Sequence, residues 1–201
     1  FMISVVIRSY LAVFDKSILV YPDELRYVEI AKSIWNDGSI AIRGYLVAYQ
    51  KILYSLALLP ANFATNTTAG MTIISILNSV YMSSAVFPTY LIAKRTLQNR
   101  WAILISMVFA VTLPAMLYSM TLMSENIYFP LMLWNIILAC KAFESNTVKG
   151  AVIWGAFAGI WNYLLYLSKE IALAWVLAYG FMLILNTVTI KKFDKIKLAS
   201  L

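Results

Sequence analysis

The sequence YPDELRYVEIAK at residues 21–32 is a charged island in an otherwise apolar chain, and the rest of the fold is organised around it. Pro22 and Asp23 predict a helix start, because proline is tolerated in the first turn and an aspartate there accepts hydrogen bonds from unpaired backbone N–H groups. Gly38 predicts the end of this helix, because glycine adopts the left-handed cap conformation without steric cost. Between these ends, apolar and charged residues fall on separate faces. We therefore expect an amphipathic helix suited to a membrane surface.

The composition indicates an integral membrane protein. Of the 201 residues, 62% are hydrophobic and 12% charged, against roughly 45–50% apolar and 25% charged in soluble domains. The apolar runs are long and continuous, unlike the alternating segments of about ten residues in a membrane barrel. We expect an all-α, polytopic fold with one or two external amphipathic helices after the first span, the second within residues 45–60. The fold would have about six transmembrane helices, near residues 1–14, 68–93, 101–122, 127–143, 151–167 and 171–190.

The positive-inside rule orients these predicted spans. Nine basic residues fall at turns on one side, opposed there only by Glu144 and Asp194, so we expect that side to be cytoplasmic. The island, the 124–126 turn and the 168–170 turn then all lie on the external face. The net charge of +7 therefore reflects topology rather than nucleic-acid binding. The nine basic residues are Lys94, Arg95, Arg100, Lys141, Lys149, Lys191, Lys192, Lys195 and Lys197.

Acid–base chemistry must rely on carboxylates, because the chain has no histidine and its one cysteine, Cys140, lies inside an apolar run. Asp23 and Glu24 are adjacent carboxylates beside the predicted bilayer surface. They are read either as acids that cap the helix and favour its dipole, or as a functional pair. Glu125 is likewise read as a helix-start acid after Ser124, or as an acid that a shaped helix start directs into a cavity.

Three cations are candidate ligands for an anionic group on the external face. Lys169 interrupts an apolar stretch and runs against the positive-inside trend, so it is read either as a phosphate ligand or as part of a solvated turn, with Glu170 as its partner or cap. Arg26 and Arg43 fall on the same predicted face. Carboxylate oxygens are also the ligands that a divalent cation prefers, so Asp23, Glu24 and Glu125 are possible metal ligands, although no spacing requires a metal.

The pattern Asp23-Glu24-x-Arg26-Tyr27-x-Glu29-Ile30-Ala31 resembles the first external loop of the GT-C class of membrane glycosyltransferases. It is especially similar to the lipid A aminoarabinose transferases and protein O-mannosyltransferases, whose loop after the first span opens with an Asp-Glu pair. Residues 42–44, the 124–126 turn and the order of spans extend the resemblance. Two departures are that residues 45–54 replace a Pro-Pro-Leu-type run, and that such enzymes have more spans. We therefore expect residues 1–201 to be a single GT-C-like module, truncated at the C-terminus and possibly at the N-terminus.

The resemblance implies an inverting glycosyltransferase in a prokaryotic plasma membrane. A sugar would pass from a polyprenyl-phosphate donor to a lipid, protein or glycan acceptor on the extracytoplasmic face, and no cofactor would be required. Asp23 would be the base, with Glu24 or Glu125 in support, and Lys169, Arg43 and Arg26 would hold the phosphate. The alternative is a transporter or flippase of a lipid-linked or anionic solute. The sequence disfavours it, because charges sit at span ends and no inverted repeat is evident.

Overall fold

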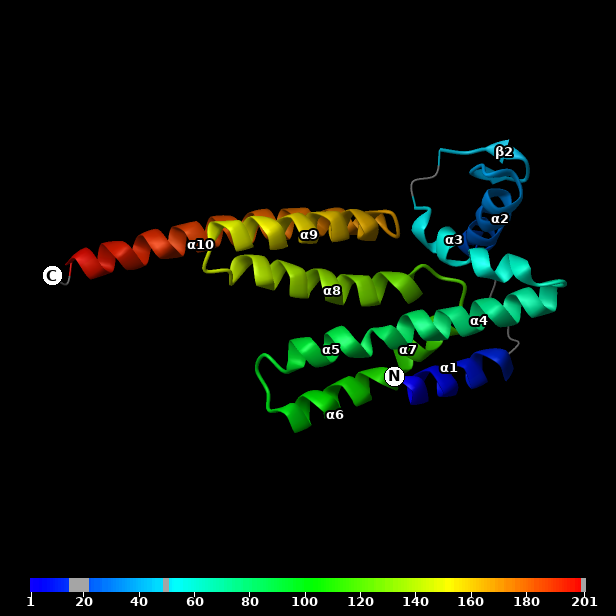
Figure 1. Cartoon of the computed structure of the whole chain (residues 1–201), viewed down its shortest axis with the longest axis horizontal. Coiled ribbons are helices and arrows are strands. Elements are labelled where there is room, and N and C mark those ends of the chain that lie inside the picture. Colours follow the sequence, from blue (N-terminus) through cyan, green and yellow to red (C-terminus); the bar gives the residue numbers. More distant parts are fainter. Residues whose placement is uncertain (15–21, 49–50, 200–201) are drawn as a thin grey trace.

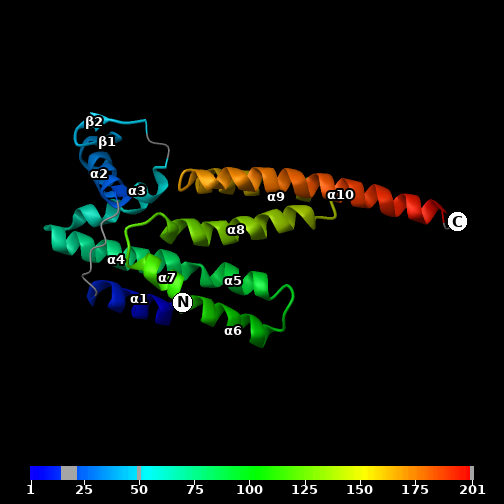
Figure 2. The same cartoon turned by 180° about the vertical axis from the view of Figure 1, so that it is seen from behind.

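The computed structural model describes residues 1–14, 22–48 and 51–199, and these residues are mostly helical with one two-stranded hairpin, which confirms the all-α class. Figures 1 and 2 show that α4 and α5 run alongside α8, that α9 and α10 lie beyond α8, and that α1 and α6 lie on the opposite side. The helix α2 and a small hairpin sit at one end. The long helices are α1 (Met2–Phe14), α2 (Pro22–Asp37), α4 (Thr67–Ser84), α6 (Asn99–Ala110), α8 (Glu125–Phe143), α9 (Val148–Tyr166) and α10 (Leu173–Ala199). The shorter elements are β1 (Ala41–Ile42), β2 (Tyr45–Leu46), α3 (Leu53–Ala57), η1 (Leu59–Phe63), α5 (Val86–Ala93), α7 (Leu113–Ser119) and η2 (Glu170–Ala172).

The helix α2 begins and ends as the sequence predicts. Its first residue is Pro22, and Gly38 follows its last residue with a φ of 64°. The Gly38 N–H donates to the carbonyl of Ile34 at 3.1 Å, which satisfies one of the carbonyls left open at a helix end.

Part of the apolar face of α2 is covered by protein. Tyr27 and Ala31 are buried in a cluster with Tyr54, Leu58 and Ile74, so this face packs on α3 and α4. The Tyr27 and Tyr54 rings meet edge to face at 5.0 Å, a favoured aromatic geometry. Trp35, on the same face one turn later, is 44% exposed, so contact of α2 with a membrane surface stays a prediction for the C-terminal part of the helix.

The second surface helix is shorter than residues 45–60. Tyr45 and Leu46 pair instead with Ile42 and Ala41 in an antiparallel hairpin, and helix begins only at Leu53. The hairpin turn consists of Arg43 and Gly44, whose φ angles are 51° and 82°. Two positive φ angles match the two-residue turns that close hairpins, and helical periodicity carries no signal for such a turn.

Two helical segments, Thr67–Ala93 and Glu125–Phe143, are long and apolar enough to cross a membrane. Within the part of the chain that the structure describes, three further apolar helices are shorter: Met2–Phe14, Asn99–Ala110 and Glu170–Leu185. The predicted span at 101–122 is broken after Ala110 and a new helix begins at Leu113, because Pro114 in its first turn cannot donate a backbone hydrogen bond to the preceding turn. The helix at 67–93 is likewise divided at Ala85, three residues before Pro88.

The break between α6 and α7 is bridged by Arg8 of α1. This arginine is 1% exposed and donates to the carbonyls of Ala110 and Ala115, to Ser119 Oγ and to Ser4 Oγ. The carbonyl of Ala110 belongs to the last turn of α6, where no intrahelical donor remains. The expectation that charges sit only at span ends is therefore wrong for Arg8, which lies in the middle of an apolar helix.

The two ends of the bundle differ in charge. Lys94, Arg95 and Arg100 surround the turn between α5 and α6, and an ion pair of 2.7 Å between Arg95 and Glu144 joins this turn to the one between α8 and α9. Figure 1 shows both turns at the end of the bundle opposite α2 and the hairpin. The charged island in α2 and the basic turns are therefore separated by the length of the helices.

Candidate functional site

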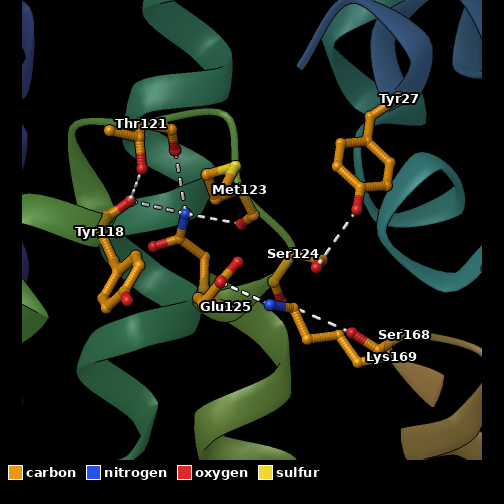
Figure 3. Close-up of polar contacts among 9 residues, drawn as sticks. Tyr27, Tyr118, Thr121, Met123, Ser124, Glu125, Ser168 and Lys169 are labelled. Carbon is orange, nitrogen blue, oxygen red and sulfur yellow. Dashed lines mark hydrogen bonds and ion pairs between the residues drawn. The ribbon is translucent and has the colours of Figure 1, made fainter. Parts of the chain in front are cut away.

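The turn that leads into α8 is held by one buried amide. Asn126 Nδ2 donates to the carbonyls of Tyr118 at 2.8 Å, Thr121 at 3.0 Å and Met123 at 3.0 Å. Figure 3 shows these bonds converging on the amide nitrogen. The Thr121 carbonyl also accepts from Asn78 Nδ2 of α4 at 3.0 Å. A buried network that contacts so many carbonyls fixes the backbone just before the first residue of α8, which is Glu125.

Ser124 joins the turn to two distant segments. The Tyr27 hydroxyl of α2 donates to Ser124 Oγ at 3.3 Å, and Ser168 Oγ makes a long contact of 3.5 Å with the Ser124 carbonyl. Ser124 makes no side-chain cap for α8, so its hydroxyl is engaged with α2 rather than with its own helix. The island, the 124–126 turn and the 168–170 turn therefore meet at one place, as Figure 3 shows.

The charged pair at this meeting point is Glu125 and Lys169. Lys169 Nζ lies 2.5 Å from Glu125 Oε1, and Glu125 is only 9% exposed. The second carboxylate oxygen, Glu125 Oε2, is buried without a hydrogen-bond partner among the described residues. A buried acceptor without a donor is costly, so this oxygen marks a point of unmet hydrogen-bonding capacity in the site.

A second ion pair fastens the same turn to the segment before α3. Lys51 Nζ lies 3.0 Å from Glu170 Oε1, and the Leu53 N–H donates to the Leu167 carbonyl at 3.0 Å. Glu170 is therefore the partner of Lys51, and the interpretation of Glu170 as the partner of Lys169 is wrong. Two neighbouring residues of this turn thus bind two different segments: Lys169 pairs with Glu125 at the start of α8, and Glu170 pairs with Lys51 before α3.

The other predicted site residues lie elsewhere or outside the description. Asp23 and Glu24 belong to the first turn of α2, one turn before Tyr27, and their side chains lie outside the described residues. Arg26 is exposed on α2. Arg43 lies at the hairpin turn, where its Nε is 3.7 Å from Glu29 Oε1. The structure thus joins Glu125 to Lys169 and places Arg43 in a separate cluster.

A metal site formed by Asp23, Glu24 and Glu125 stays a prediction. Within the described ranges, no three carboxylates or cysteines are grouped closely enough to hold a metal ion, and the side chains of two of these three acids fall outside those ranges.

Sequence reasoning missed three contributors to this centre, which are Tyr27, Asn78 and Asn126, and it also missed Arg8 at the break between α6 and α7. Tyr27 was placed on the apolar face of α2, and its hydroxyl contact with Ser124 had no local signal, since 97 residues separate the two. Asn126 and Asn78 carried a weak signal, because an amide inside an apolar helix must find hydrogen-bond partners. Arg8 carried a clear signal, as a charge in the middle of an apolar run.

Comparisons with protein families, with curated proteins and with solved structures find no match to this chain. The arrangement of the site itself therefore carries the functional argument. It offers a buried carboxylate with one oxygen that has no hydrogen-bond donor among the described residues, a partly exposed lysine beside it, and a helix carrying two further carboxylates that contacts the site through Tyr27.

Proposed function

We propose that the chain is a polytopic membrane protein that transfers a sugar from a polyprenyl-phosphate donor to an acceptor, on the side of the membrane where α2 lies. The observation that carries this proposal is the Glu125–Lys169 pair, placed where three predicted external segments meet. A transferase of this kind needs a cation for the departing phosphate and a carboxylate for the acceptor proton at one end of a lipid-facing bundle.

The distribution of polar and apolar side chains supports membrane embedding. Ser79, Ser83, Asn78 and Asn135 are buried between helices, whereas large apolar side chains of α6, α9 and α10 are exposed. Helices in lipid pack through small and polar residues and present apolar residues outward. The basic turns between α5 and α6 and between α8 and α9 would face the cytoplasm under the positive-inside rule.

In the proposed reaction Asp23 accepts the proton of an acceptor hydroxyl. The acceptor oxygen attacks the anomeric carbon of the sugar from the side opposite the phosphate. The bond between that carbon and the phosphate oxygen breaks, and its electron pair leaves with the polyprenyl phosphate. Inversion follows from this geometry, and the phosphate needs no strong general acid because it is a good leaving group.

Lys169 binds the phosphate in this proposal, with Arg26 as a second cation on α2. Because Lys169 is already paired with Glu125, the donor phosphate has to compete with the carboxylate for the ammonium group. Glu125 released in this way has both oxygens available to orient the acceptor or to support Asp23. In the absence of donor, the Glu125 carboxylate therefore balances the charge of Lys169, and the donor phosphate replaces the carboxylate when it binds.

Lys169→Gln is expected to weaken binding of a polyprenyl phosphate about tenfold or more, whereas Glu125→Gln is expected to strengthen it by leaving the lysine unpaired. Binding of a radiolabelled polyprenyl phosphate to the purified protein in detergent measures both effects. Lys149→Gln, at the opposite end of α9, is the matched control, and Lys169→Arg should retain binding. Equal affinity in the wild type and Lys169→Gln would rule out Lys169 as the phosphate ligand.

A transporter or flippase is the second candidate function, and Arg8 is the observation that favours it. A buried charge within an apolar helix is typical of transport pathways. However, the hydrogen bonds of Arg8 to described residues go to carbonyls and hydroxyls of α1, α6 and α7. These contacts hold α1, α6 and α7 together and therefore indicate a structural role for Arg8. The transferase remains the better supported proposal.

A further inference from the structure

A polar hollow of about 330 Å³ lies between α2 and the hairpin, and the proposed transfer reaction does not use it. It is open to solvent, and its volume is at the lower end of the range for small-molecule sites. The side chains that matter for its chemistry are Glu29, Lys32, Asn36, Asp37, Ser39 and Arg43.

This hollow is separate from the Glu125–Lys169 centre. Glu29, Lys32 and Asn36 occupy one face of α2, whereas Tyr27, Ile30 and Ala31 are buried on the other. Tyr27 is the residue that reaches Ser124, so the two sites lie on opposite faces of a helix about 10 Å across. Neither Glu125 nor Lys169 lines the hollow.

The charges around the hollow balance. Glu29 and Asp37 are acceptors only, Lys32 and Arg43 are donors only, and the Asn36 amide does both. The single ion pair across it, between Arg43 Nε and Glu29 Oε1, is loose at 3.7 Å. An anion would meet two carboxylates and a cation would meet two basic groups, so the lining favours a neutral ligand that both donates and accepts hydrogen bonds.

Arg43 occupies an unfavourable backbone position for its residue type. Its φ of 51° lies in the left-handed region, where asparagine or glycine is preferred in a hairpin turn of this kind. Its side chain is 73% exposed, so packing does not compensate for the conformation. A strained residue that no packing explains is expected where its side chain serves a function.

We propose that this hollow is a binding site for a neutral carbohydrate. Sugar hydroxyls donate and accept at once, which matches acceptor-only carboxylates alternating with donor-only cations and an amide. Arg43 binds two ring oxygens or hydroxyls through its guanidinium, and Asn36 binds a third. This assigns Arg43 to a glycan rather than to the donor phosphate, and it does not depend on the proposed transfer reaction.

The test uses the full-length protein in detergent and the neutral trisaccharides chitotriose, mannotriose and maltotriose. Saturation-transfer NMR is expected to detect binding of at least one of them to the wild type. Arg43→Asn is expected to weaken that binding at least tenfold while raising the apparent melting temperature by about 2–4 °C, because asparagine relieves the left-handed strain. Asn36→Ala should weaken binding without this stabilisation.

Arg100→Gln, at the far end of the bundle, is the control and should bind the sugars as the wild type does. Sugar binding to Arg43→Asn and polyprenyl-phosphate binding to Lys169→Gln are measured separately, so that failure of the phosphate proposal is distinguishable from failure of this one. The proposal is overturned if the wild type binds none of the three sugars, or if Arg43→Asn and Asn36→Ala both bind as tightly as the wild type.

Discussion

Asp23→Asn is expected to slow sugar transfer by about 10²–10⁴-fold, the range that a positioned general base contributes. Asp23 is the second residue of α2, so asparagine there loses only the favourable interaction of a carboxylate with the helix dipole, about 0.3–1 kcal/mol, and α2 should remain folded. The rate of sugar transfer from a labelled polyprenyl-phosphate donor, in a single turnover in detergent, measures the effect.

The matched control for this variant is Glu144→Gln, which removes an exposed carboxylate from the opposite end of the bundle. Donor binding should be unchanged in Asp23→Asn, because the proposal assigns the phosphate to Lys169. Full transfer activity in Asp23→Asn would remove Asp23 as the base, and with it the proposed proton path.

The second large effect concerns stability. Lys169→Gln is expected to lower the free energy of unfolding by about 2–4 kcal/mol, because it leaves the buried Glu125 carboxylate without its counter-charge. Glu125→Gln should cost less, since Lys169 is 32% exposed and water can solvate the ammonium group. The double variant should recover most of the loss, because it leaves no unpaired charge.

A double-mutant cycle measured by denaturant unfolding in micelles gives the coupling energy directly. The exposed Arg95–Glu144 pair is the internal comparison, and Arg95→Gln should cost less than about 1 kcal/mol. If Lys169→Gln costs as little as Arg95→Gln, the Glu125–Lys169 pair is a solvated surface contact and carries no functional argument.

Much of the helical framework could be predicted from the sequence. Pro22 and Gly38 fix the ends of α2 through local backbone chemistry, which one sequence displays in full. The apolar runs predicted the helices of the bundle, and counting them placed the 124–126 and 168–170 turns at the same end as α2. Alternation of helix direction is enough for that inference, whatever the details of packing.

The contacts within the site could not be predicted in the same way. Lys169 has Glu170 beside it in the chain but pairs with Glu125, 44 residues away. Helix packing brings these two side chains together, and no local sequence pattern predicts that contact. The contact between Tyr27 and Ser124 likewise depends on helix packing and could not be predicted locally. The hydrogen bonds of Arg8 to the break between α6 and α7 could not be predicted either, because Pro114 indicates a break but not what binds there.

The most direct test of the proposed function follows the fate of the anomeric bond in vesicles. Full-length protein is reconstituted into liposomes that carry a polyprenyl-phosphate sugar labelled in both the sugar and the lipid, and a candidate acceptor mixture is added. The transferase proposal predicts that free polyprenyl phosphate accumulates as the sugar label moves to the acceptor, and that Asp23→Asn abolishes both. Movement of the intact donor between the two leaflets, with no cleavage of its sugar–phosphate bond, would contradict the proposal and favour a flippase.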